Sequence, residues 1–407
     1  MSQTLHDKAL AYHQECRPGN INVSSHKKLD NDQYLSLAYS PGVAAPVREI
    51  VKDPSAVNKY TIKSNLVAVI TDGSAVLGLG NVGPLAAKPV MEGKAVLFKR
   101  FAGIDVFNIE LGTQDVDEIV NTIKNIAPTF GGINLEDISA PRCFEIEKRL
   151  IDELDIPVFH DDQHGTAIIV AAGLLNALEI QEKNFKEAKI VCAGAGSAGI
   201  ATLNLLLELG FSKDNILLVD RNGVVSIKSE NLSKEKLTFA ADTDKKNLSD
   251  AIAGSDVFIG VARGNLVTQE MVKSMAKRPI IFALSNPDPE ISPVDVYACR
   301  DDVLMATGRS DYPNQVNNVL GFPYIFRGAL DANSKIINTE MKVAAVHALK
   351  DLVKLPAPKE LIEIYKDTSL TFGKDYFIPK PFDPRLIKVV PKAIFDAAVA
   401  SGASRLK

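Results

Sequence analysis

The sequence has few of the features that mark unusual classes of protein. It contains no tryptophan, only four cysteines and no C-x-x-C pair, which excludes a disulfide-stapled scaffold and argues against a zinc site. Its 46 basic and 50 acidic residues give a net charge of −4, so the composition offers no basic surface for nucleic acid or an anionic membrane. The most apolar stretch, residues 166–178, is too short to span a bilayer, and the N-terminus lacks the apolar segment of a signal peptide. We therefore expect a cytoplasmic protein with a site for a small molecule.

Length and patterning indicate an α/β protein with more than one domain. At about 150 residues per domain, 407 residues correspond to two or three domains. Short β-branched runs alternate with segments of helical periodicity, which is typical of parallel sheets covered by helices. The expected strands are residues 66–71, 105–111, 132–138, 156–160, 189–193, 215–220, 257–261, 279–284 and 303–307. The expected helices are residues 86–98, 116–126, 143–154, 166–178, 200–209, 341–353 and 393–400.

We divide the chain near the acidic residues 161 and 162, because a complete nucleotide-binding unit begins soon after them. Residues 1–160 are expected to form a smaller N-terminal α/β domain that binds the substrate. Residues 161–390 are expected to form a Rossmann-like, doubly wound parallel sheet that binds a nucleotide, and residues 391–407 a helical tail.

Two G-x-G-x-x-G strings occur, and the second has the context of a dinucleotide site. A strand must precede the glycines and a helix must follow, so that the pyrophosphate lies on the helix N-terminus, and an acidic residue must close the next strand. The second string meets each condition, with Asp220 at the end of the next strand. It consists of Gly194, Ala195, Gly196, Ser197, Ala198 and Gly199. The first string, residues 78–83, runs into a proline and is expected to be a close-packed loop beside a substrate pocket.

The choice between NAD and NADP stays open at this point. Asp220 would bond the ribose 2′-hydroxyl and favours NAD, whereas Arg221 follows immediately and could meet a 2′-phosphate. The pattern therefore favours NAD only slightly.

Two acidic pairs follow the strands of consecutive βα units. Glu136 and Asp137 close one strand, and Asp161 and Asp162 close the next. The carboxyl ends of parallel strands share one edge of the sheet, where these carboxylates repel one another unless a cation joins them. Hard oxygen ligands suit Mg²⁺ or Mn²⁺, so the sequence favours a metal site over the alternative that the acids cap the following helices. For His164 a structural role is favoured over a place among the ligands.

Two further residues are ambiguous from the pattern alone. Lys94 lies in a helix beside apolar residues, and most helical lysines are solvated. A partly buried lysine near a dication would have a lowered pKa and could act as a base. Tyr39 precedes a Pro-Gly turn, where a tyrosine usually serves packing.

Seven motifs occur in an order that resembles the malic enzyme family over nearly the whole chain. They are residues 38–43 (AYSPGV), 71–73 with 78–81 (TDG and GLGN), 134–137 (NLED), 159–166 (FHDDQHGT), 194–199 (GAGSAG), 284–287 (LSNP) and 317–318 (NN). The length is similar to that of the short bacterial form, which lacks an added acyltransferase-like domain. An ordered set of this kind is far more specific than any single motif.

The resemblance implies oxidative decarboxylation of L-malate to pyruvate and CO₂, with reduction of NAD or NADP and a required Mg²⁺ or Mn²⁺. It implies that Lys94 is the general base, that Tyr39 is the general acid and that Asp161 supports the site. Asn286 and Asn318 correspond to residues at the substrate and the nicotinamide, and Lys94 also contacts the substrate. The family further suggests a homodimer whose N-terminal arm delivers Tyr39 to the partner's site. The implied metal ligands are Glu136, Asp137 and Asp162.

Three positions depart from the longer eukaryotic members of the family. Ser74 and Ala75 follow the Asp-Gly pair where those members carry an arginine that binds the substrate. The cation for the C4 carboxylate of malate is therefore undetermined, and Arg309 is a candidate. His160 stands where those members usually have asparagine, which is expected to alter only the surroundings of the site.

Two other functions stay open. A malolactic activity, which converts malate to lactate and CO₂ and retains NAD, would use the same motifs. A catalytically inactive nucleotide-binding regulator is the alternative outside the enzymes, although every residue implied in the chemistry is present.

Overall fold

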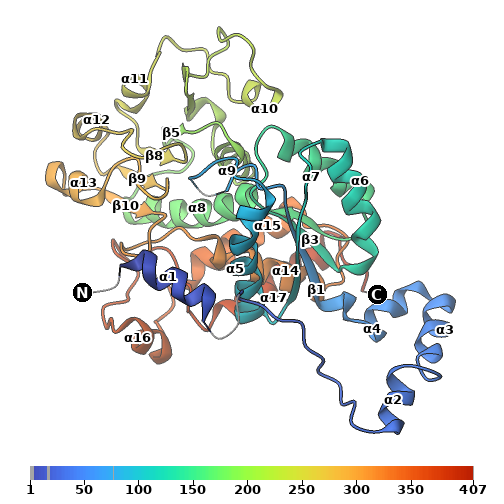
Figure 1. Cartoon of the computed structure of the whole chain (residues 1–407). Helices are drawn as coiled ribbons and strands as arrows, with labels where there is room; N and C mark the ends of the chain where they lie inside the picture. The colour runs from blue at the N-terminus through green and yellow to red at the C-terminus, as the bar shows by residue number, and fades with distance from the viewer. Residues whose placement is uncertain (1–3, 16–18, 77, 407) are drawn as a thin grey trace.

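The computed structural model describes residues 4–15, 19–76 and 78–406, and these residues contain two β-sheets flanked by helices (Figure 1). The first sheet has the order β2-β1-β3-β4, and every neighbouring pair is parallel. Its strands are β1 (Leu66–Thr71), β2 (Asp105–Glu110), β3 (Gly132–Leu135) and β4 (Val158–His160). They confirm the α/β prediction for this part of the chain, with β3 and β4 shorter than expected.

Both faces of β1 are buried, because helices cover both sides of the first sheet at this strand. Its even-numbered side chains pack with α6 (Val116–Ile126) and α7 (Arg142–Glu153). Its odd-numbered side chains face the opposite way, toward α5 (Pro84–Ala102) and α14 (Phe322–Asp331). The alternation follows from the two-residue period of a strand. Helix α6 coincides with the predicted range.

The second sheet has the order β10-β9-β8-β5-β6-β7 and is parallel except at one edge. Its strands are β5 (Ile190–Ala193), β6 (Ile216–Asp220), β7 (Gly223–Val224), β8 (Val257–Gly260), β9 (Ile280–Ala283) and β10 (Leu304–Thr307). β7 is antiparallel to β6, because the chain reverses in a tight turn directly after β6. The Rossmann-like, doubly wound prediction is confirmed, with the correction that the sheet is not parallel throughout.

The strand order of the second sheet reverses between β5 and β8. From β5 the chain builds outward to β6 and β7, and it then returns to place β8 on the other side of β5. Ligands of open α/β sheets bind in the crevice at the carboxyl ends of the strands where such a reversal occurs. The glycine string at residues 194–199 follows β5 and therefore lies at this crevice.

Helix α8 (Asp161–Ile180) is largely buried and packs against α9 (Ser197–Glu208) and α15 (Thr339–Leu352). The prediction that this helix begins at residue 166 is wrong, because the helix starts directly after β4. The His160 ring accepts a hydrogen bond from Gln163 N at 3.4 Å, which satisfies one of the amide donors that a helix N-terminus leaves free. The acids at 161 and 162 therefore belong to the first helical turn, whereas the sequence pattern placed them at the end of a strand.

Helix α5 continues through Pro89, although the sequence pattern tolerates this proline only in the first turn. Pro89 has no amide hydrogen for the carbonyl of Leu85, one turn earlier. Leu85 itself is exposed, so this part of the helix lies at the surface.

The C-terminal helices pack onto the first sheet. Helix α17 (Leu386–Ala400) contacts α14 and α15, and the Phe326 and Leu330 side chains of α14 lie against the glycines that begin β3. Helix α17 starts before Pro391, so it is longer than the predicted helix at 393–400. The division of the chain into residues 1–160, 161–390 and 391–407 stays a prediction.

The other α-helices of the described residues have ten residues or fewer. They are α1 (Leu5–Gln14), α2 (Asp32–Ala38), α3 (Ala44–Lys52), α4 (Val57–Tyr60), α10 (Lys234–Leu237), α11 (Leu248–Ile252), α12 (Gln269–Ser274), α13 (Pro293–Cys299) and α16 (Lys359–Tyr365). Across the part of the chain that the structure describes, no helix is both long and apolar enough to cross a membrane.

Helices α2 and α3 stand away from the rest of the molecule (Figure 1). All residues of these two helices are exposed or half-buried. Several of the exposed side chains in and beside them are large and apolar: Tyr34, Leu35, Leu37, Tyr39, Val43, Val47 and Val51. A concentration of exposed apolar side chains on one segment is typical of an interface that another chain covers.

Candidate active site

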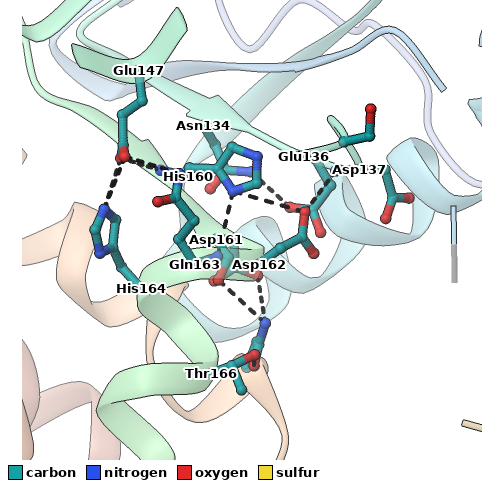
Figure 2. A network of polar contacts seen from close by, with 12 residues as sticks. Asn134, Glu136, Asp137, Glu147, His160, Asp161, Asp162, Gln163, His164 and Thr166 are labelled. Atoms are coloured by element: carbon teal, nitrogen blue, oxygen red, sulfur yellow. Dashed lines mark hydrogen bonds and ion pairs between the residues drawn. The ribbon is translucent and has the colours of Figure 1, made fainter. Parts of the chain in front are cut away.

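Three carboxylates converge at the edge of the first sheet where β3 and β4 end (Figure 2). Glu136 and Asp137 follow β3 directly, and Asp162 lies in the first turn of α8, directly after β4. Each residue offers an oxygen, and these oxygens all lie within 4.8 Å of one another. The arrangement follows from the fold, because β3 and β4 are parallel neighbours whose carboxyl ends share one edge. We refer to these three residues as the carboxylate cluster.

Local hydrogen bonds shape the carboxylate cluster. Asp137 N donates to Asp162 Oδ2 at 2.8 Å, which joins the two segments. Asn134 Nδ2 donates to Glu136 Oε2 at 2.9 Å. Asp137 has a φ of 53°, in the left-handed region that few non-glycine residues adopt. Residues held in such conformations concentrate at functional sites.

Lys94 reaches the carboxylate cluster from α5. Its Nζ lies 2.9 Å from Glu136 Oε1, 2.7 Å from Asp161 Oδ2 and 4.3 Å from the centre of the Phe322 ring. The side chain points inward because Lys94 shares a helix face with the buried Met91, one turn earlier. Only 11% of the Lys94 side chain is exposed, so it is a buried cation between two buried anions.

Burial and charge together shift the pKa values of these groups. Burial alone lowers the pKa of Lys94, but the charges of Asp161 and Glu136 outweigh it and hold that pKa above its ordinary value. Burial raises the pKa of Glu136 and of Asp161, and the charge of Lys94 opposes the rise in both. The direction for Lys94 is opposite to the lowered pKa that the sequence argument expects, because two carboxylates contact the amine directly.

The donor set of the cluster fits a hard divalent cation. Carboxylate oxygens are the ligands that Mg²⁺ and Mn²⁺ prefer, and three carboxylates leave coordination positions open for a substrate. Thiolate ligands are far less suited to these ions, and burial raises the pKa of Cys143 and of Cys192 to about 12. His164 is turned away from the cluster, and its Nε2 lies 2.9 Å from Glu147 Oε1.

Asn318 lies beside Asp161. Its Nδ2 donates to Asp161 Oδ2 at 3.3 Å, and Thr166 Oγ1 donates to Asn318 Oδ1 at 3.1 Å. Gly165 makes this approach possible, because a Cβ there would lie 2.1 Å from Asp161 Oδ1 and 3.1 Å from the Asn318 side chain. The structure thus brings Asn318, from a distant segment, to the acid that contacts Lys94.

The first glycine string packs against Asn286. A Cβ at Gly78 would lie 2.6 Å from Asn286 O, and a Cβ at Gly73 would lie 2.3 Å from Gly83 O. Residues 78–83 therefore form the close-packed loop that the sequence predicts. Asn286 itself follows β9 and so lies at the carboxyl edge of the second sheet.

A cavity of about 930 Å³ lies at the crevice between β5 and β8. Glycine is required there twice, because Gly194 has a φ of 120° and a Cβ at Gly199 would lie 1.9 Å from Gly194 O. The glycine string contributes to the cavity wall and then begins α9, and its members are Gly194, Ala195, Gly196, Ser197, Ala198 and Gly199. A helix N-terminus at such a cavity suits a pyrophosphate.

Asp220 lines the same cavity and is already engaged by a cation. Its Oδ2 lies 2.5 Å from Lys236 Nζ, and Arg221, Lys246 and Arg263 also line the cavity. Sequence reasoning missed Lys236, because it lies in the short helix α10, in a polar segment without a motif. The lysine-rich run at residues 234–236 was the available signal.

Two predicted site residues lie away from the carboxylate cluster in this chain. Tyr39 follows α2 and is 71% exposed, on the segment that stands away from the body (Figure 1). Arg309 forms a two-point ion pair with Asp311, at 2.7 and 2.9 Å, and donates to Pro287 O at 3.0 Å. Arg309 therefore lies near the Asn286 loop, with its guanidinium group committed to these partners.

Comparison with known proteins assigns both halves of the chain to one family. The sequence model of the malic enzyme N-terminal domain matches residues 18–151, and that of the malic enzyme NAD-binding domain matches residues 163–367. A protein of Halomonas elongata named NADP-dependent malic enzyme is 55% identical over 405 residues, which cover 100% of this chain and 96% of that protein.

Two relatives from Rhizobium meliloti are each 52% identical, and one is named NADP-dependent malic enzyme and the other NAD-dependent malic enzyme. The matches cover 100% and 98% of this chain but 53% and 52% of those proteins, so the chain spans about half the length of these two relatives.

Similarity extends to a solved structure. The crystal structure of the malic enzyme from Pyrococcus horikoshii is 41% identical and has a TM-score of 0.91, with 99% of this chain and 93% of that chain covered. The domain matches, the sequence identities and the shared fold agree along nearly the whole length. This chain belongs to the malic enzyme family.

Proposed function

We propose that this protein catalyses the oxidative decarboxylation of L-malate to pyruvate and CO₂, with reduction of a nicotinamide dinucleotide. The observation that carries the proposal is the contact between Lys94 and the carboxylate cluster, at 2.9 Å from Glu136. A 2-hydroxy acid fits such a site, because its carboxylate and hydroxyl oxygens are hard donors and its hydroxyl carries the proton that a base must remove.

The roles of the buried groups follow from their contacts. When bound by the cluster, Mg²⁺ or Mn²⁺ supplies a Lewis acid for the substrate oxygen and a positive charge that offsets the carboxylates holding the Lys94 proton. Lys94 Nζ then accepts the proton of the C2 hydroxyl as C2 is oxidised. Asp161, 2.7 Å from the same nitrogen, orients the amine and stabilises the ammonium that forms.

Two asparagines and a tyrosine complete the proposed site. Asn318, held by Asp161 and Thr166, and Asn286, at the end of β9, offer neutral amides to a carboxylate or a carboxamide. Loss of CO₂ leaves enolpyruvate, whose C3 must gain a proton. We assign that proton to the Tyr39 hydroxyl.

Tyr39 is proposed to act in the site of a partner subunit of a homodimer. It lies on the α2–α3 segment, which stands away from the body of its own chain and exposes large apolar side chains. A second copy of this chain would cover those side chains and would bring Tyr39 to a site that already contains Lys94. This arrangement explains why the described chain holds the base and the general acid apart.

NADP is proposed as the preferred cofactor. A 2′-phosphate brings about −1.5 to −2 charges at neutral pH, and a cationic surrounding favours it. Four cationic side chains line the nucleotide cavity, and one of them, Lys236, already neutralises the Asp220 carboxylate. The sequence pattern, by contrast, slightly favours NAD. The four cationic side chains that support NADP are Arg221, Lys236, Lys246 and Arg263.

Product analysis tests the proposed function. Purified protein incubated with L-malate, Mn²⁺ and NADP should form NADPH and pyruvate in equal amounts. Lactate formed without release of reduced cofactor would identify the malolactic reaction instead. The absence of turnover with both NAD and NADP would favour the inactive regulator. Location in the cytoplasm stays a prediction.

A further inference from the structure

Glu147 is a buried carboxylate beside the active site that the chemistry above does not use. It lies in α7, is 6% exposed and faces the first turn of α8 (Figure 2). Its Oε1 accepts a hydrogen bond from His160 N at 2.9 Å, and its Oε2 accepts one from Gln163 Nε2 at 3.0 Å. His164 Nε2 lies 2.9 and 3.0 Å from the two oxygens. All of these donors belong to residues 160–164.

The same residues carry two acids of the active site. His160 ends β4, and α8 begins at Asp161 with no loop between the strand and the helix. Bonds from Glu147 to the His160 backbone and to side chains within the first turn therefore fix the direction in which α8 leaves the sheet. That direction determines where the side chains of Asp161 and Asp162 point.

Lys342 extends this network to a third helix. It comes from α15, and its Nζ lies 3.2 Å from both His164 Nδ1 and His164 Nε2. The His164 ring thus contacts both the Lys342 ammonium and the Glu147 carboxylate. A buried carboxylate needs both hydrogen bonds and a balancing charge, and this arrangement supplies them from α8 and α15.

We propose that Glu147 is a positioning residue, which fixes the first turn of α8 so that Asp161 contacts Lys94 and Asp162 joins the carboxylate cluster. Its consequence for catalysis rests on the proposed function, whereas its consequence for metal binding does not. Groups that orient metal ligands from outside contribute about 10- to 100-fold to metal affinity.

Glu147→Gln is the most direct variant. It keeps the size of the side chain but replaces one acceptor oxygen by an amide NH₂, which then faces the donors of Gln163 and His164. Lys342→Met is the second variant, because it keeps the carboxylate and removes the balancing cation. Asp383→Asn is the matched control, since Asp383 is another buried carboxylate, paired with Arg385 at 2.6 Å.

The readout is Mn²⁺ binding to the metal-free full chain, followed by electron paramagnetic resonance of free Mn²⁺ and therefore independent of turnover. We expect Glu147→Gln to weaken Mn²⁺ binding by about 10-fold or more and Lys342→Met to shift it in the same direction. NADPH binding, followed by its fluorescence, should stay at the wild-type value. The glycine string that is expected to bind NADPH comes after β5 of the second sheet, whereas Glu147 packs at the edge of the first sheet. Asp383→Asn should lower thermal stability without changing Mn²⁺ binding.

Wild-type Mn²⁺ affinity in folded Glu147→Gln, or an equal loss of affinity in Asp383→Asn, would overturn the positioning role. If Glu147→Gln does not fold, Lys342→Met decides the question by the same criterion. Failure of the proposed function has a different signature. The wild-type protein would then bind Mn²⁺ and form no pyruvate from L-malate, while the effect of Glu147→Gln on Mn²⁺ binding would persist.

Discussion

Lys94 Nζ lies 2.7 Å from Asp161 Oδ2, although the two residues are 67 positions apart in the sequence. The pair joins α5, which covers one face of the first sheet, to the first turn of α8. Asp161 is completely buried, so its carboxylate is shielded from water and keeps the amine as its partner. Their contact places the amine next to the carboxylate cluster, where the proposed chemistry needs a base.

Removal of this amine should abolish most of the reaction. We expect Lys94→Ala to lower the rate of malate oxidation by about 10²- to 10⁴-fold, the usual contribution of a general base. Steady-state NADPH formation measures the effect. Lys99→Ala is the control, because Lys99 lies in the last turn of the same helix and pairs on the surface with Asp105. Near-normal turnover in Lys94→Ala would show that another group is the base.

Mixed subunits test whether Tyr39 acts in the partner's site. Tyr39→Phe and Lys94→Ala should each form pyruvate far more slowly than the wild-type protein. After the two variants are unfolded and refolded together, half of the dimers are mixed, and each mixed dimer has one intact site. Activity should then return to about one quarter of the wild-type value, as expected for a twofold-symmetric dimer. No recovery, with mixed dimers verified by mass spectrometry, would place Tyr39 in its own subunit's site.

Lys236 should determine the cofactor preference. We expect Lys236→Ala to raise the KM for NADP by about 10- to 100-fold, the effect of losing one hydrogen bond to a charged group. The KM for NAD should change little, because NAD lacks the 2′-phosphate. Binding of 2′,5′-ADP measured by calorimetry provides a readout without turnover. Equal losses for the two cofactors would mean that Lys236 supports the cavity in general.

The pair of Asp302 with Arg300 should make stability depend on pH in the acid range. Hydrogen bonds from the Arg300 side chain, at 2.7 and 2.8 Å, lower the pKa of Asp302 to about 2 from an ordinary value of 3.8. Below the ordinary value the unfolded chain binds this proton more readily than the folded chain. The stabilisation is therefore complete above about pH 4 and is lost as the pH falls toward 2.

Urea unfolding midpoints between pH 5 and pH 2 measure this contribution. The midpoint of the wild-type protein should fall more steeply over this range than that of Asp302→Asn. Arg300→Met should flatten the slope in the same way, because it removes the guanidinium that holds the carboxylate ionised. Identical slopes in all three proteins would show that this pair does not contribute.

Much of the fold could be predicted from the alternation of strands and helices and from the glycine string, whereas the start of α8 could not. Strand positions followed from β-branched runs, because both faces of a central parallel strand are buried. The apolar run predicts that α8 starts at residue 166, directly after Gly165, and a glycine often separates a strand from a helix. In the structure Gly165 lies inside the helix, where the absence of a Cβ makes room for the Asp161 carboxylate. Local sequence does not distinguish these two uses of glycine.

The candidate site was predictable where its residues fall at strand ends or in motifs. Glu136, Asp137 and Asp162 come together because neighbouring parallel strands end at one edge. Lys236 and Glu147 belong to the surroundings of the site only through tertiary contacts. Charged residues surround both of them in the sequence, so apart from the lysine-rich run at residues 234–236 nothing separates them from solvated surface residues.

A titration of metal-free protein with Mn²⁺ tests most directly whether the carboxylate cluster and Lys94 form one catalytic site. Bound Mn²⁺ is counted by electron paramagnetic resonance, and NADPH formation from L-malate is recorded on the same sample. We predict a single Mn²⁺ per chain, activity that rises in proportion to occupancy, and loss of both in Asp162→Asn. Full malate oxidation in chelator-treated protein, or unchanged Mn²⁺ binding in Asp162→Asn, would contradict this prediction.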